Sequence, residues 1–105
     1  VVRTGKLAHI PGHEFRGGGG VTPARWLFLK TGESAMMGHC HRTSEHSEPN
    51  LSGKQIACWS TGCLSELHPS YMRHTKWNHG FSTIVVDSSG DFEVSNHRII
   101  NGKVL

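Results

Sequence analysis

The strongest constraint on the fold is a short uncharged run that ends in a glycine and two histidines. Residues 34–37 read Ser-Ala-Met-Met, and Gly38, His39, Cys40 and His41 follow. We predict a buried strand over this run. If the strand continued, His39 and His41 would share one side of it, because side chains alternate with period two. If the chain turns instead, both imidazoles still lie at the strand's end. Two imidazoles there suit a transition metal, and the competing interpretation is a polar loop with solvated histidines.

The amount of apolar sequence limits how much core the chain can build. Its 105 residues fit one small domain or one piece of a larger domain. Only 35% are hydrophobic, and 13 are glycine. We therefore expect residues 1–105 to form a single, partial domain that needs a missing N-terminal half or self-association. The net charge of +3 is scattered, which is compatible with a phosphate-bearing ligand.

Cysteine usage and hydropathy bear on the compartment. The three cysteines, Cys40, Cys58 and Cys63, are odd in number, and we interpret them as ordinary reduced thiols. No secretory signal opens the sequence, and no apolar run approaches the roughly 20 residues that span a bilayer. We expect a cytoplasmic protein, of a bacterial or phage-infected cell, without a membrane partner.

One helix is predicted over residues 23–30. Thr22 is a suitable N-cap, Pro23 a suitable first helical residue and Gly32 a suitable stop. Lys30 would lie in the last turn, where the helix dipole favours a cation. The core contacts expected from this helix are Trp26, Leu27 and Leu29.

The remaining elements are predicted to be strands. They are expected at residues 6–10, 34–37, 55–60, 81–87, 92–96 and 98–104, the last of these interrupted by a turn at Asn101 and Gly102. The polar residues 43–50 read as a loop. The chain is therefore expected to be mainly β with one short helix, of the α+β class, closed by a β-meander.

Three of these features occur in a recognisable order. A strand with a Gly-His element covers residues 7–14, a Gly-His-x-His element covers 38–41, and a strand and turn at 58–63 leads into the meander at 77–104. This order resembles the C-terminal portion of the calcineurin-like metallophosphoesterases. That superfamily includes the nuclease of double-strand-break repair, and the pattern resembles its phage-encoded members. The resemblance implies the C-terminal half of a β-sandwich.

The resemblance also implies a chemistry, the hydrolysis of phosphomonoester or phosphodiester bonds at two ions of manganese, iron or zinc. It makes His39 a ligand of one metal and His41 a ligand of the other. The second site would be completed by His13 or His9, and we favour His13 because it is nearer the turn. The choice stays open because Pro11 stands where the family commonly has a further histidine. The residues expected to support the ligands or contact phosphate are His9, Glu14, Arg16, Arg42 and His46.

Several motifs of the family are absent from the chain. In members of the family the N-terminal half carries Asp-x-His, Gly-Asp-x-x-Asp and Gly-Asn-His motifs, and none of these motifs occurs in this chain. The only aspartates are Asp87 and Asp91, in or beside the predicted terminal hairpin. Because two dications need carboxylates to balance their charge, we expect little catalysis by this chain alone.

Two other function classes compete with the phosphoesterase. One is a non-catalytic module that binds a single structural zinc or a nucleic acid, and its candidate zinc ligands are His39, Cys40, His41, His46, Cys58 and Cys63. The other is a small His-Asn-His nuclease, suggested by Trp77, Asn78 and His79. We give the second little weight, because that stretch runs straight into a strand. The number and kind of bound metal ions separate these classes.

Overall fold

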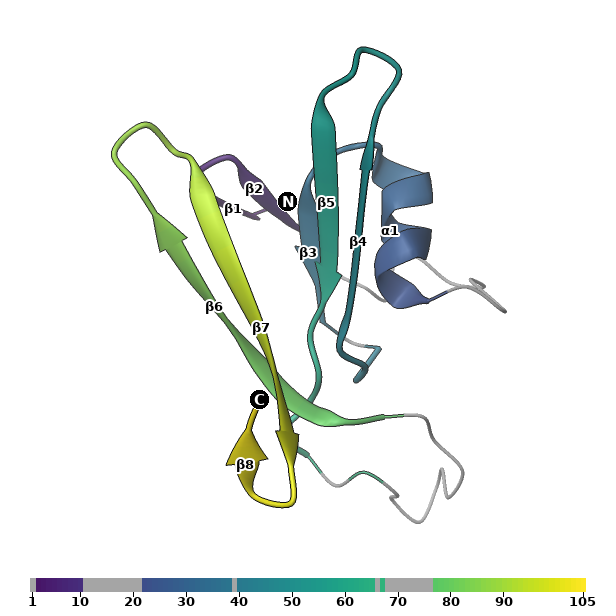
Figure 1. Ribbon diagram of the computed structural model, residues 1–105, viewed down its shortest axis with the longest axis vertical. Helices are drawn as coiled ribbons and strands as arrows, with labels where there is room; N and C mark the ends of the chain where they lie inside the picture. The colour runs from purple at the N-terminus through teal and green to yellow at the C-terminus, as the bar shows by residue number, and fades with distance from the viewer. Residues whose placement is uncertain (1, 11–21, 39, 66, 68–76) are drawn as a thin grey trace.

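The structure is a computed structural model that describes residues 2–10, 22–38, 40–65, 67 and 77–105. It contains a five-stranded sheet, a three-stranded sheet and one helix in this described part (Figure 1). The elements are β1 (Val2–Thr4), β2 (Leu7–Ile10), α1 (Pro23–Thr31), β3 (Ala35–Met37), β4 (Ser44–Pro49), β5 (Gln55–Ser60), β6 (His79–Val86), β7 (Phe92–Ile100) and β8 (Lys103–Val104). The expectation of a mainly β chain with one short helix, of the α+β class, is confirmed.

Parallel strands form the centre of the larger sheet. Its strand order is β1-β2-β3-β5-β4, with β2, β3 and β5 parallel and the two outer strands antiparallel to their neighbours. The segment that contains α1 connects β2 to β3, as a parallel crossover requires. Ile10 pairs with Met37, and Met37 pairs with Ser60. The carboxyl ends of the three central strands therefore lie level at one edge of the sheet.

The smaller sheet is the predicted β-meander. β6 and β7 pair without interruption from His79↔Ile99 to Val86↔Phe92, and β8 adds to the other side of β7. β7 is longer than the strand predicted over residues 92–96, because β6 offers it a partner along its whole length. The predicted turn at Asn101 and Gly102 separates β7 from β8, and both residues have a positive φ there.

The prediction of a loop over residues 43–50 was wrong, because β4 occupies most of this segment. Asn50 closes a turn in which its Oδ1 atom accepts hydrogen bonds from the backbone N–H groups of Ser52 and Lys54. This turn brings β4 back along β5. β4 is polar because it is the outer strand of the sheet, where charged side chains and the terminal Pro49 are tolerated.

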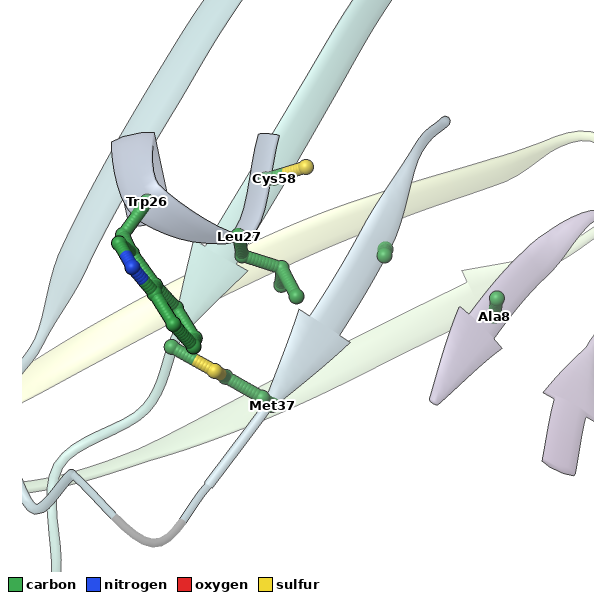
Figure 2. Close-up of a cluster of buried hydrophobic side chains, with 6 residues drawn as sticks. Ala8, Trp26, Leu27, Met37 and Cys58 are labelled. Atoms are coloured by element: carbon green, nitrogen blue, oxygen red, sulfur yellow. The ribbon is translucent and has the colours of Figure 1, made fainter. Parts of the chain in front are cut away.

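The helix covers one face of the larger sheet. Trp26 and Leu27 on α1 pack with Ala8, Ala35, Met37 and Cys58 from three strands (Figure 2). Gly32 ends the helix in the left-handed conformation, and its N–H donates to Phe28 O at 2.9 Å. Thr22 has the extended N-cap backbone but makes no side-chain cap hydrogen bond. Instead the Ser44 hydroxyl accepts a hydrogen bond from the N–H of Ala24 at 2.9 Å.

One core contact expected of the helix was wrong. Leu29 is 59% exposed, whereas Leu27 is fully buried and Trp26 is 9% exposed. The side chain of Leu29 follows that of Leu27 by two positions, and residues two apart do not share a helix face.

The β6–β7 hairpin covers the opposite face of the larger sheet. There Leu7, Met36 and Trp59 form a second cluster, and Ile84, Phe92 and Val94 from the hairpin pack against it. Met36 thus faces the hairpin, while the adjacent Met37 faces the helix. Strand β3 is covered on both sides, which explains why its sequence contains no polar residue.

A polar contact joins the hairpin turn to the turn between β1 and β2. Lys6 Nζ lies 2.8 Å from Asp91 Oδ1, and the N–H of Lys6 donates to Gly90 O at 2.9 Å. The hydrogen bond and charge of Asp91 raise the pKa of Lys6, and those of Lys6 lower the pKa of Asp91. Hydrogen bonding from Ser89 lowers the pKa of Asp87. Both aspartates lie in the hairpin, where they were predicted.

Candidate functional site

The candidate site is the edge of the larger sheet where the three parallel strands end. β3 ends at Met37, and Gly38 and the His-x-His segment follow directly. The sequence that contains His13 follows β2 directly after Ile10, whose cross-strand partner is Met37. The loop after β5 begins beside Met37, because the N–H of Thr61 donates to Met37 O at 3.1 Å. Loops at the carboxyl ends of parallel strands are where ligands commonly bind in such sheets.

His41 has an unusual environment at this edge. Its φ of 57° places it in the left-handed region, which is uncommon for a residue other than glycine. Its ring packs edge-on against Trp77, with centroids 4.3 Å apart. The Nδ1 atom of His41 is buried and has no hydrogen-bond partner among the described residues. Buried polar atoms are seldom left unpaired, so this nitrogen calls for an explanation.

Asn78 fixes the backbone that follows His41. Its Oδ1 atom accepts a hydrogen bond from the N–H of Thr43 at 2.7 Å, and its Nδ2 atom donates to Thr43 Oγ1 at 2.6 Å. The backbone N–H of Asn78 donates to His41 O at 2.8 Å. Sequence reasoning missed this role. The signal was a polar residue directly before a strand, which we had weighed only as part of a nuclease motif.

The loop after β5 lies in backbone contact with the start of β6. The N–H of Cys63 donates to Asn78 O, and the N–H of Gly80 donates to Cys63 O, both at 3.0 Å. At Gly62, a Cβ atom would lie 2.7 Å from Asn78 O and 2.8 Å from Gly80 N. Only glycine fits such a close approach between two backbone segments.

A second polar group ties the hairpin to the ends of β4 and β5. Asn96 Nδ2 donates to Ser60 O at 2.9 Å and to Ser44 O at 3.2 Å, and its Oδ1 atom accepts from the Ser82 hydroxyl at 2.8 Å. Ser60 is fully buried, and its hydroxyl donates to Arg42 O at 2.6 Å. The backbone of Arg42 is thus held in place, as is that of Thr43.

Several of the predicted site residues lie outside the described residues. These are His13, Glu14, Arg16 and His39. Of the three metal ligands that we predicted, the structure therefore describes only His41. In the described ranges no three or more histidine, cysteine or carboxylate side chains gather as they would around a metal ion.

His9 and His46 lie within strands rather than in the loops. His9 is on β2, and its Nε2 atom is 2.7 Å from the hydroxyl oxygen of Thr4 on β1. His46 is on β4, where its ring packs against Phe28 of α1 with centroids 5.3 Å apart. The buried Nε2 atom of His46 is 3.5 Å from Glu48 Oε2 without a hydrogen bond. His9 is the second-last residue of β2 and His46 the third residue of β4, and their rings contact Thr4 and Phe28.

The cysteines belong to the packing of the fold. Cys58 is fully buried beneath the helix, and its thiol donates to Glu33 O at 3.2 Å. Burial raises the pKa of the Cys58 thiol. Burial also raises the pKa of Cys40, although the charge of Arg42 acts in the opposite direction. All three cysteines are free of disulfides. The described candidates for a single zinc are therefore not gathered around one point.

Comparison with known proteins adds no relative. No family model matches the chain, and no match was found among curated proteins or solved structures. Within the described ranges, no helix is both long and apolar enough to cross a membrane. What the chain does must be inferred from its own residues.

Proposed function

We propose that this chain is the C-terminal part of a metallophosphoesterase-like hydrolase and supplies the histidine side of its metal site. The observation that carries the proposal is the pairing of Ile10 with Met37. It places the chain positions from which the His13 segment and the His39–His41 segment continue next to each other at one edge of the sheet. In the proposal both segments bring their imidazoles to one point at this edge.

The state of His41 supports a ligand role. One of its ring nitrogens is buried and uncommitted in the described structure, and the backbone on its C-terminal side is held by Asn78 and Ser60. Metal ligands need such fixed positions. In this proposal His13, His39 and His41 hold ions of manganese, iron or zinc. A metal pair of this kind activates water and stabilises charge on a phosphoester.

The placement of the carboxylates indicates what the chain lacks. Asp87 and Asp91 lie at the far end of the β6–β7 hairpin, beside Lys6 and the turn between β1 and β2. They cannot serve histidines at the opposite edge of the sheet. In the proposal the aspartate that would bridge the metal ions therefore comes from another segment, and this chain alone binds metal without turning over a phosphomonoester, a phosphodiester or a nucleic acid.

Elemental analysis of untagged protein tests the proposal. The protein would be incubated with Mn²⁺ or Zn²⁺, desalted and measured beside the double variant His39→Gln with His41→Gln. We expect up to about two ions per chain in the original protein. The double variant should lose them. A matched control is His97→Gln, because His97 lies on β7 against Phe81, outside the candidate site, and should leave the metal content unchanged.

Two results would contradict the proposal. One is the absence of bound metal in original protein whose circular dichroism shows a native fold. The other is equal metal content in the original protein and the double variant. A single tightly held zinc ion per chain, in place of two ions, would favour the structural-zinc module instead.

A further inference from the structure

The outer edge of β6 is the least protected strand edge of the described chain. β6 is the end strand of its sheet and has eight residues without charge or proline. The other end strands are guarded, because β1 has three residues, β8 has two, and β4 carries Glu45, Glu48 and Pro49. Proteins usually shorten, charge or cover such edges, since an open edge binds another strand.

Two hydrogen bonds fix the direction of the backbone groups along β6. At its start, the N–H of Gly80 donates to Cys63 O, away from β7. Just past its end, the N–H of Asp87 donates to Asp91 O, across the hairpin. Backbone groups alternate between the two sides of an antiparallel strand. Even-numbered residues of β6 therefore direct their N–H and C=O groups to the open edge, and odd-numbered residues direct theirs to β7.

The open groups are those of Ser82, Ile84 and Val86. In the described structure none of them makes a backbone hydrogen bond beyond its own sheet. At the beginning of the same edge, His79 already forms an isolated parallel bridge with Cys63. What remains is a row of donors and acceptors long enough to pair with an extended segment of five residues.

We propose that this edge pairs with the same edge of a second copy of the chain. In an antiparallel pair with Ile84 on the two-fold axis, Ser82 lies opposite Val86 of the second copy, and these residues exchange their N–H···O bonds. Thr83 then lies opposite Val85 of the second copy. Val85 is 67% exposed in the single chain, and this β-branched pair covers it.

A second copy fits this edge because the strand is complementary to itself. When β6 faces its own copy, no like charges come together. Two copies of β4 would bring glutamates together, and β1 and β8 are too short to pair in this way. The resulting six-stranded sheet has the order β8-β7-β6 in one copy, followed by β6-β7-β8 of the second copy. The proposal is independent of the metal site, which lies on the other sheet's edge.

Light scattering coupled to size-exclusion chromatography tests the pairing. The original protein should approach twice its chain mass of 11.6 kDa as its concentration rises. The double variant Thr83→Lys with Val85→Lys places four lysines around the two-fold axis, and it should raise the dissociation constant by at least about tenfold. The control Ser88→Lys with Ser95→Lys adds the same charge to exposed positions of the hairpin turn and of β7, which β6 separates from the open edge, and it should change the constant less than about twofold.

Amide hydrogen exchange tests the register without a substitution. Ser82, Ile84 and Val86 should exchange quickly in dilute protein and slowly in concentrated protein, whereas Thr83 and Val85 should be protected in both. The proposal is overturned by a chain that stays monomeric at about millimolar concentration. A dimer that tolerates the edge lysines, or one in which the even-numbered amides remain unprotected, overturns it equally.

Discussion

Asn78 and Gly62, which packs against it, determine the local shape of the candidate site. The side-chain amide of Asn78 forms hydrogen bonds with the backbone N–H and with the hydroxyl of Thr43. The backbone of Asn78 forms hydrogen bonds with His41 and Cys63. This close packing leaves no room for a side chain at Gly62. The residues that position the backbone around His41 are therefore uncharged, and the sequence did not predict this role for them.

Gly62 and Gly38, two glycines of this region, should respond differently to substitution. Gly62→Ala would push a methyl group against the backbone of Asn78 and Gly80, so we expect it to lower the free energy of unfolding by about 1–3 kcal/mol. Gly38→Ala would meet only the Thr61 methyl group at 3.8 Å, and a change of less than about 0.5 kcal/mol is expected. Urea denaturation followed by tryptophan fluorescence measures both. Equal effects would show that the close approach at Gly62 is not rigid.

At the residue scale, the sequence predicted the position of the Gly-His-x-His element better than the surroundings of the other histidines. The Gly-His-x-His element was rightly placed at the end of a strand, since an uncharged run followed by glycine is a local signal. His9 lies in a strand, as predicted, whereas His46 lies in a strand where a loop was predicted. Their partners, Thr4 and Phe28, depend on strand pairing and on helix packing, which single-sequence patterns do not contain.

Among the elements, α1 shows that local sequence signals determine where a helix begins and ends, whereas packing determines which of its side chains are buried. Pro23 and Gly32 set its bounds, as predicted. Which of its apolar side chains is buried depends on the sheet beneath it, and so Leu29 was misjudged. β4 was missed for a related reason, because its polar sequence forms a strand only when the turn at Asn50 returns it to β5.

Two leucines of the helix test this division. Leu27 is fully buried between α1 and the sheet, so Leu27→Ala should lower the free energy of unfolding by about 2–5 kcal/mol. Leu29 is 59% exposed, and Leu29→Ala should change it by no more than about 0.5 kcal/mol. Thermal unfolding followed by circular dichroism provides the comparison. A large loss at Leu29 would mean that something covers the helix in solution.

The molecule as a whole has three layers, with the helix and the β6–β7 hairpin on opposite faces of the larger sheet. Apolar side chains such as Trp59 and Phe92 join the two sheets in the middle. At one end Lys6 and Asp91 join them through an exposed ion pair. At the other end Asn96 connects the hairpin to Ser60.

The Lys6–Asp91 pair should make stability depend on pH at both extremes. The pKa of Asp91 is lowered in the fold, so its contribution is present above the unfolded pKa of about 3.9 and is lost as the pH falls through the lower folded value. The pKa of Lys6 is raised, so its contribution is present below about pH 10.4 and is lost as the pH rises through the higher folded value.

The variant Lys6→Ala tests this dependence. It should unfold at a lower temperature than the original protein near pH 7, and the difference should shrink below about pH 4 as Asp91 becomes protonated. Differential scanning calorimetry across this pH range measures it. Lys103→Ala, on the terminal strand β8, removes an equal charge from elsewhere on the surface. A Lys6→Ala difference that stays constant with pH would show that the loss is one of packing.

The hydrogen bonds between Thr43 and Asn78 span 35 positions of the sequence. A ribosome releases the histidine segment well before it releases the residue that anchors it. While the polypeptide is still growing, the His41 loop therefore lacks this anchor, and its shape is completed only as β6 begins to emerge. A product that ends between His41 and Asn78 would carry both histidines of the His-x-His element and yet lack the hydrogen bonds that hold the backbone of His41 and Thr43. Possession of the motif is therefore not enough to fix the position of His41.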